Sequence, residues 1–160
     1  LDTYADAATY SSFSIQRRAR GSLAAPLAVQ EGDWCGGFSF RGRSAAGEWA
    51  QRALVNVVVD GPVAAGAVPM AMDFWTGDSG LAERMRITSS GRVGIGKTTP
   101  TVALDIAGAV RVGSFTTTSL PAASEVGAGA MVYVADAPAG ATLAYSDGSV
   151  WRDVSTQSAI

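Results

Sequence analysis

Apolar and polar residues alternate one by one along most of this chain, with the period of two that is typical of β-strands buried on one face. The pattern is clear around Phe38 and Phe40 and from Met70 to Trp75. It recurs in shorter stretches, at residues 13–20, 84–88, 93–95, 102–106, 110–112, 132–134, 143–145 and 150–154. The best helix candidate, residues 45–53, contains Gly47 and amounts to about two turns at most. The alternation therefore predicts an all-β fold.

Turn-forming residues fall between the predicted strands. Gly, Asp and Pro gather at residues 31–33, 60–62, 76–78, 90–91, 138–140 and 147–148. These residue types supply the backbone angles that tight turns require. One solid apolar run, Val57-Val58-Val59, interrupts the alternation and predicts a strand covered on both faces.

Three zones can be separated along the chain. Residues 1–88 hold most of the aromatic side chains and are expected to form a β-rich shaft or knob domain. Residues 89–115 carry short strands separated by glycines and are too thin to build a core, so we expect a stem there. Residues 116–160 begin with a Ser/Thr/Ala/Pro-rich stretch and end in a predicted hairpin, a tip module. A middle zone that cannot bury itself suggests that other copies of the chain supply the missing partners.

Composition removes several classes of chemistry. The 160 residues include no His and one Cys, and the formal net charge is −2. Without His, a Ser-His-Asp triad, a Cys-His pair and a His-ligated metal are excluded. Cys35 alone can form neither an intrachain disulfide nor a Cys-x-x-Cys metal site. We therefore expect no enzyme activity, no catalytic residue, no metal and no cofactor.

Charge and hydropathy also bear on partners and location. A net charge near zero argues against non-specific binding to nucleic acid or to an anionic membrane. The most apolar window, residues 53–72, is broken by Asn56, Asp60, Pro62 and Pro69, so no membrane-spanning segment is expected. No secretory signal is visible, and because the chain begins with Leu1, an anchoring segment could precede it.

Residues 91–98 satisfy the phosphate-binding pattern G-x4-G-K-S/T, with Lys97 and Thr98 in the positions that would meet a nucleotide. That chemistry needs a helix directly after the loop, whose N-terminus faces the phosphates. Here a β-branched run broken by Pro100 follows instead, which resists helix formation. The sequence therefore predicts a structural turn rather than a nucleotide site.

Other charged residues have simple structural interpretations. The basic cluster at residues 17–20 is divided between the two faces of a strand, which favours a solvated or cross-strand-paired surface. Paired carboxylates could support glycoside hydrolysis, although most of them fall in turns or on outward strand positions. The carboxylates available for such a pair are Glu48, Asp60, Asp73, Asp78, Glu83, Asp105, Asp136 and Asp147.

Tryptophan and tyrosine supply the candidate ligand-binding residues, since exposed aromatic rings are natural platforms for sugar faces and for subunit contacts. The side-surface candidates are Trp34, Trp49 and Trp75, and the candidates in the terminal module are Tyr145, Asp147 and Trp151. The alternative is that each tryptophan packs between strands or chains.

Several motifs together resemble the tail and head fibres of bacteriophages. Residues 91–100, followed by 102–106, are similar to the G-x-V-G-I-G-T-T-x-P shaft element of those fibres, and residues 83–90 are similar to its E-R-M-R-I lead-in. Similarity to the repeated shaft unit and to the terminal s-D-G-x-x-W-R module extends the resemblance to about three quarters of the chain, over residues 18–22, 25–26, 32–33, 38–42, 129–134, 144–148 and 151–152. Lys97 stands where Thr is usual in the shaft element. The apparent phosphate-loop pattern therefore arises from one substitution in a structural repeat.

The resemblance implies a homotrimeric fibre or spike on the virion surface, with short strands and hairpins of three chains intertwined. Many relatives carry a self-cleaving chaperone domain after this element, and this sequence shows no such domain. We therefore expect either that trimerisation rests on this chain itself or that the sequence is a processed product. The residues expected in the trimer core are Val93, Ile95, Leu104, Ile106, Val110 and Val112. Gly94 and Gly96 are expected to permit close approach at the threefold axis.

The implied function is adsorption. The trimer would contact a host glycan or receptor, and its other partners would be further virion proteins, without nucleic acid and without membrane insertion. Two alternatives remain open: a head-decoration or connector protein that binds only virion proteins, and a polysaccharide depolymerase.

Overall fold

The computed structural model describes residues 15–160, which form two compact units, one ending at Gly108 and the other spanning Ala109–Ile160. Strands make up nearly all of the regular structure, so the predicted all-β fold is confirmed. Residues 13 and 14 of the predicted 13–20 strand, and residues 1–14 of the expected first domain, lie outside the described part of the chain.

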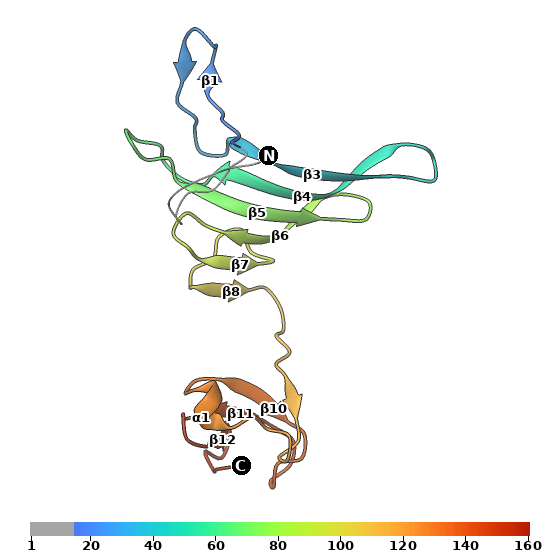
Figure 1. The fold of residues 1–160 in the computed structure, drawn as a ribbon, viewed down its shortest axis with the longest axis vertical. Coiled ribbons are helices and arrows are strands. Elements are labelled where there is room, and N and C mark those ends of the chain that lie inside the picture. The colour runs from blue at the N-terminus through green and yellow to red at the C-terminus, as the bar shows by residue number, and fades with distance from the viewer. Residues whose placement is uncertain (1–14) are drawn as a thin grey trace, which may run out of the picture. The chain divides into compact units, whose positions relative to one another are not determined.

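The first unit is built on a six-stranded sheet in which strands adjacent in the chain are also adjacent in space (Figure 1). All neighbours are antiparallel except the last pair, which is parallel. In order, the strands are β3 (Trp34–Arg43), β4 (Trp49–Val59), β5 (Met70–Thr76), β6 (Ala82–Ile87), β7 (Val93–Ile95) and β8 (Leu104–Ile106). A separate antiparallel hairpin, β1 (Arg20–Gly21) and β2 (Pro26–Leu27), precedes the sheet.

The strand register sorts the side chains of this sheet onto two chemically different faces. Paired residues share a face, and two apolar rows cross the sheet in this way. One row contains Phe38, Val55, Phe74, Met85, Ile95 and Ile106, and the next contains Val57, Met72, Ile87, Val93 and Leu104. The row between them points to the other face and is polar or small, with Gly37, Asn56, Asp73, Arg86, Gly94 and Asp105.

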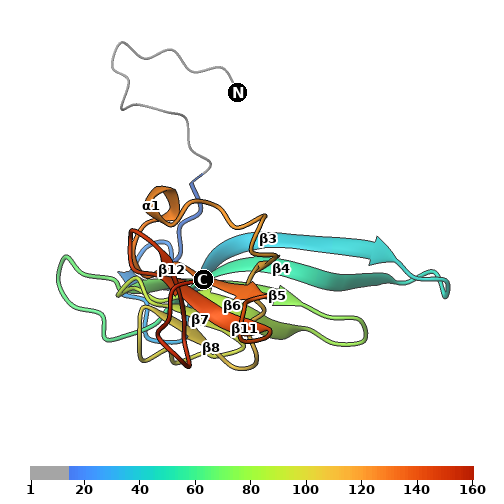
Figure 2. The same ribbon diagram turned by 90° about the horizontal axis from the view of Figure 1, so that it is seen from below.

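Several local expectations can be compared with these strands. The prediction for residues 57–59 is confirmed at Val58 and Val59, which alternate to opposite faces of β4 and are both buried. The helix candidate at residues 45–53 is wrong, because a turn at 44–48 leads directly into β4. The β3–β4 hairpin that results extends beyond the β5–β6 hairpin (Figures 1 and 2).

The stem expected at residues 89–115 is divided differently in the structure. β7 pairs with β6 and β8 pairs with β7, so both belong to the same sheet as residues 34–87. The boundary between the units falls after Gly108. Alternation along a strand identifies its faces but not its neighbours, which is why the sequence did not show this pairing.

The expected role of Gly94 at a threefold axis is corrected by its position. Gly94 lies in the polar row, on the face opposite Val93 and Ile95. A Cβ at Gly94 would lie 2.2 Å from the carbonyl oxygen of Lys97, so the loop after β7 already requires glycine within one chain. Gly96 has φ +68°, and its turn conformation also favours glycine.

The second unit is a smaller four-stranded sheet in the order β12-β11-β10-β9, with one short helix. Its elements are β9 (Ser114–Phe115), α1 (Ala123–Val126), β10 (Met131–Val134), β11 (Thr142–Ser146) and β12 (Trp151–Asp153). One face of this sheet carries the core, which consists of Ala123, Val132, Val134, Ala137, Ala144 and Trp151.

Candidate functional site

The apolar rows of the six-stranded sheet form one continuous surface, called here the apolar face: Phe38, Phe40, Val55, Val57, Met70, Met72, Phe74, Met85, Ile87, Val93, Ile95, Leu104 and Ile106. Within one chain much of it is open to solvent, and Phe38 is 61 % exposed and Leu104 55 %. The six most exposed members alone present on the order of 600 Å² of apolar surface. The largest patch on a typical monomer covers about 300–600 Å² and is often functional, so an apolar surface at the upper end of that range on one sheet face indicates an interaction surface.

Four of the six residues expected in a trimer core lie on the apolar face. Ile95 and Leu104 are exposed there, while Val93 and Ile106 are half-buried. The other two, Val110 and Val112, belong to the second unit, where they line a groove with Tyr133 and Leu143. The sequence did not indicate the part of the face from Phe38 to Phe74, because residues 1–88 were expected to form a domain separate from the stem.

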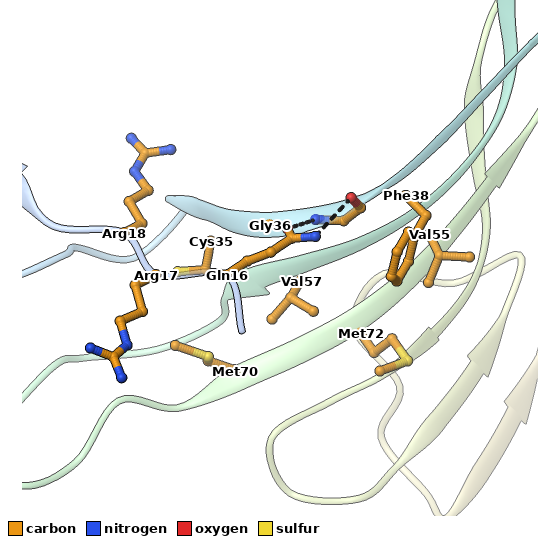
Figure 3. A pocket seen from close by; sticks show the side chains of 11 residues that line it. Gln16, Arg17, Arg18, Cys35, Gly36, Phe38, Val55, Val57, Met70 and Met72 are labelled. Carbon is orange, nitrogen blue, oxygen red and sulfur yellow. Dashed lines mark hydrogen bonds between the residues drawn. The ribbon is translucent and has the colours of Figure 1, made fainter. Parts of the chain in front are cut away.

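A groove of about 550 Å³ lies on the apolar face near the start of β3. Val57, Met70 and Met72 line it together with Cys35 (Figure 3). The segment before β1 borders the groove, and Figure 3 shows Arg17 and Arg18 pointing to opposite sides of that segment.

Gln16 fixes this bordering segment to the edge strand β3. Its Oε1 accepts a hydrogen bond from the backbone N–H of Gly37 at 2.7 Å, and its Nε2 faces the carbonyl oxygen of Gly37 at 3.4 Å. The side-chain amide thus pairs with β3 much as a neighbouring peptide group would. A Cβ at Gly36 would lie 2.1 Å from Gln16 Oε1, so a glycine at that position keeps room for the contact.

The opposite face of the sheet, called here the polar face, brings two of the tryptophan candidates together. The ring centroids of Trp34 and Trp75 are 5.9 Å apart and tilted by 52°. Trp34 is 47 % exposed, while Trp75 is half-buried and donates its Nε1–H to Asp73 Oδ1 at 2.8 Å. Trp49 is exposed at the other end of β4 and is paired in register with Arg43, so it does not join this pair.

Charged side chains are arranged beneath the tryptophan pair. Arg86 donates to Glu83 at 2.7 Å and lies 3.7 Å from Asp73 Oδ2. Burial raises the pKa of Asp73, and the hydrogen bond from Trp75 partly opposes that rise. The hydrogen bond to Glu83 raises the pKa of Arg86. Asp73 and Glu83 are nearly buried on one guanidinium, so they are not open to a saccharide as a hydrolytic pair.

A second charged cluster ties the first hairpin to the sheet. Arg20 donates to both carboxylate oxygens of Asp33, at 2.7 and 2.8 Å, and Arg18 donates to Oδ1 at 3.1 Å. The backbone N–H of Gln30 donates to Oδ2 at 3.0 Å. The Arg20 hydrogen bond is the main reason that the pKa of Asp33 lies well below its usual range. The basic cluster is therefore engaged with a buried carboxylate.

Lys97, in the loop that resembles a phosphate-binding motif, forms an ion pair within the chain. Lys97 Nζ lies 2.8 Å from Asp105 Oδ1, and Thr101 donates its backbone N–H to Asp105 Oδ2 at 3.0 Å. The hydrogen bond from Lys97 lowers the pKa of Asp105. No helix follows in residues 97–108, so the prediction that this stretch resists helix formation is confirmed.

The three candidates in the terminal module do not form one site. Trp151 is 5 % exposed and packs in the core of the second unit, where its Nε1–H donates to the carbonyl of Pro121 at 2.8 Å. The prediction that Trp151 is a ligand platform is therefore wrong, because its ring has no exposed face. Tyr145 is half-buried on the opposite sheet face, with its hydroxyl bonded to Gln157.

Asp147, the third candidate in this module, has a structural task in a turn. Its Oδ1 accepts the backbone N–H groups of Ser149 and Val150, both at 2.9 Å, and its Oδ2 is bound by Arg152. These hydrogen bonds, that of Val150 above all, lower the pKa of Asp147 to about 2. Its carboxylate is committed to shaping the β11–β12 turn.

Residues 15–160 contain no group of three or more His, Cys, Asp or Glu side chains placed to hold a metal ion. None of the helices in this range is long and apolar enough to cross a membrane. No protein-family model and no curated protein sequence matches the chain.

Proposed function

We propose that this protein is a subunit of a homotrimeric fibre or spike on a bacteriophage-like virion, and that it assembles through the apolar face. The observation that carries the proposal is the apolar face, which crosses all six strands of the β3–β8 sheet and which residues 15–160 leave largely exposed. The resemblance of residues 83–106 to phage fibre shafts suggests the threefold symmetry and the position on the virion surface.

The free energy available on this face is large enough for assembly. At ~25 cal/mol per Å², burying about 600 Å² per chain contributes about 15 kcal/mol. Each association step costs about 4–15 kcal/mol in lost translational and rotational freedom. A trimer forms in two steps while three chains each bury their apolar face, so the total gain exceeds the total cost. Copies of the same chain are the simplest partners because they offer an identical apolar face.

Ile95→Asp and Leu104→Asp test this assembly. Each places a carboxylate on the apolar face, so we expect monomers or insoluble chains in light scattering and native mass spectrometry. Thr99→Asp, in the exposed loop after β7, is the matched control and should stay trimeric. A parent protein that is a folded monomer in dilute solution would refute the proposal, and so would a trimer that tolerates both apolar-face substitutions.

The polar face supports the second part of the function, contact with glycans of the host surface. Trp34 keeps nearly half of its side chain open, and the Trp75 ring lies next to it with the two centroids 5.9 Å apart. A pyranose ring stacks well on such a surface. If this contact operates, Trp34→Ala lowers binding on a glycan array and in an adsorption assay, while Trp49→Ala tests the isolated side-surface candidate separately. Equal binding by Trp34→Ala and the parent would remove the tryptophan pair from the function and would favour the connector alternative.

A further inference from the structure

The first hairpin has a defined shape although it has no core of its own. Residues 19–28, called here the arm, include β1 and β2, closed by reciprocal backbone hydrogen bonds between Ser22 and Ala25 at 3.1 and 3.2 Å. Gly21 has φ +79°, and a Cβ there would lie 2.3 Å from the carbonyl oxygen of Ala25. The sequence of the arm therefore specifies this turn.

The apolar side chains of the arm are uncovered. No residue from 15 to 28 is buried, Leu23 at the tip is 102 % exposed, and Leu27 is 64 % exposed. A two-stranded hairpin is marginally stable by itself in water. An ordered arm that presents two leucines to solvent thus needs a surface to pack against.

The arm is attached to the sheet by polar contacts at its base. Arg18 and Arg20 bind Asp33, and Gln16 binds Gly37, so the base is fixed in direction. From there the arm extends beyond the β3 edge of the sheet (Figure 1). Neither Leu23 nor Leu27 is among the residues that line the groove at the base of the arm.

Within residues 15–160, no segment fills that groove. Phe38, Met70 and Met72 line it and are each more than 40 % exposed. Methionine side chains adapt readily to an inserted apolar group. Each chain thus offers one apolar projection and one apolar groove, and the two are not in contact with each other.

We infer that the arm of one copy packs Leu23 and Leu27 into the groove of a neighbouring copy. This inference rests on the proposed assembly and specifies its contact. An arm in a groove joins two different surfaces, and such heterologous contacts close into a ring when the rotation between copies allows it. The arrangement leaves Ile95 and Leu104, at the other end of the apolar face, free to meet their counterparts around the ring axis.

Cys35 allows a direct test because it lines the groove and is the one cysteine of the chain. A Leu23→Cys, Cys35→Ser chain is co-refolded with the parent chain and treated with a short bis-maleimide. Any link between residue 23 and Cys35 must then join two copies. We expect a cross-linked dimer on denaturing gels. Ser79→Cys, Cys35→Ser, with its cysteine in the β5–β6 turn, is the control that should not link.

Assembly is measured in parallel by native mass spectrometry, so that the two proposals can fail separately. A trimer with cross-links supports both. A trimer without cross-links overturns the arm contact and leaves the proposed assembly standing, whereas a parent that stays monomeric overturns both. Leu23→Asp adds a kinetic measurement, and we expect it to speed subunit exchange at least about tenfold. An unchanged exchange rate would contradict the arm contact.

Discussion

Trp75 donates its indole N–H to Asp73, two residues earlier on the same strand, at 2.8 Å. Asp73 is 1 % exposed, and its second oxygen faces Arg86. A nearly buried carboxylate is thus held in the middle of the polar face beside two neutral side chains, Trp75 and Asn56, and one distant cation. Its charge is only partly compensated, which leads to a prediction about stability and pH.

Asp73→Asn is expected to stabilise the first unit at pH 7. Burial raises the pKa of Asp73 in the folded state, so this group favours folding most below its unfolded pKa of 3.8. That contribution is lost as pH rises through the folded pKa. Asparagine keeps an oxygen for Trp75, and Arg86 keeps Glu83. In urea unfolding followed by tryptophan fluorescence, the free energy of unfolding of the variant should rise relative to that of the parent between pH 3 and pH 7.

Glu83→Gln is the contrasting variant. It removes the close partner of Arg86 and leaves that guanidinium with Asp73 at 3.7 Å. We expect a loss of about 1.5–3 kcal/mol, the range for a hydrogen bond to a charged group. If Asp73→Asn and Glu83→Gln changed the free energy of unfolding equally, the two carboxylates would be equally well compensated. That result would contradict the arrangement described here.

The second unit should lose stability in acid through Asp147. Its pKa in the folded state is lowered to about 2, whereas an unperturbed Asp has 3.8. The group therefore stabilises the fold above pH 3.8, and this contribution disappears as pH falls from 3.8 to about 2. In Asp147→Asn, the melting temperature of the second unit should depend less on pH within that window than in the parent. A carboxyl titration of Asp147 by NMR with a midpoint near 4 would contradict the assignment.

Much of the apolar face could be predicted from alternation alone. Val93, Ile95, Leu104 and Ile106 were expected on the apolar side of their strands, and they share one face of the sheet, because period two identifies residues on one side of a strand. The pairing of β6 with β7 was not predictable, since neighbouring strands in a sheet leave no mark on spacing. The part of the face from Phe38 to Phe74 was therefore assigned to a separate domain.

The tryptophans show the same limit. Trp34 meets Trp75 across β4 because the register shifts between Trp34 and Gly36, and a bulge of that kind is set by tertiary pairing. For Trp151 a signal was present. Trp151 and Asp153 alternate with Arg152, and the outward phase of that arginine places the tryptophan inward.

Trp151→Ala should unfold the second unit or nearly so. Truncation of a buried tryptophan costs about 3–5 kcal/mol, and a unit of this size has a total stability on the order of 3–8 kcal/mol. Trp151→Phe keeps most of the volume but leaves the Pro121 carbonyl without its donor, at about 1–3 kcal/mol. Hydrogen exchange by mass spectrometry over residues 109–160 measures both. Slow exchange there in Trp151→Ala would show that the ring is not part of the core.

Gly94→Ala should destabilise the first unit, and Gly42→Ala should not. An added Cβ at Gly94 would lie 2.2 Å from the Lys97 carbonyl, so the loop between β7 and β8 must move and the Lys97–Asp105 ion pair with it. Overpacking of this kind costs about 1–3 kcal/mol. At Gly42, on β3, a Cβ meets nothing within 4 Å, and alanine there should change stability by less than about 1 kcal/mol.

The two alanine variants also separate two explanations for the glycine at position 94. If Gly94 is required within one chain, urea unfolding at a low protein concentration shows the loss whether or not the chains are assembled. If it were required at an axis between chains, the loss would appear only in the assembled protein and would depend on protein concentration. Because Gly94 lies on the polar face, opposite Val93 and Ile95, we expect the first result.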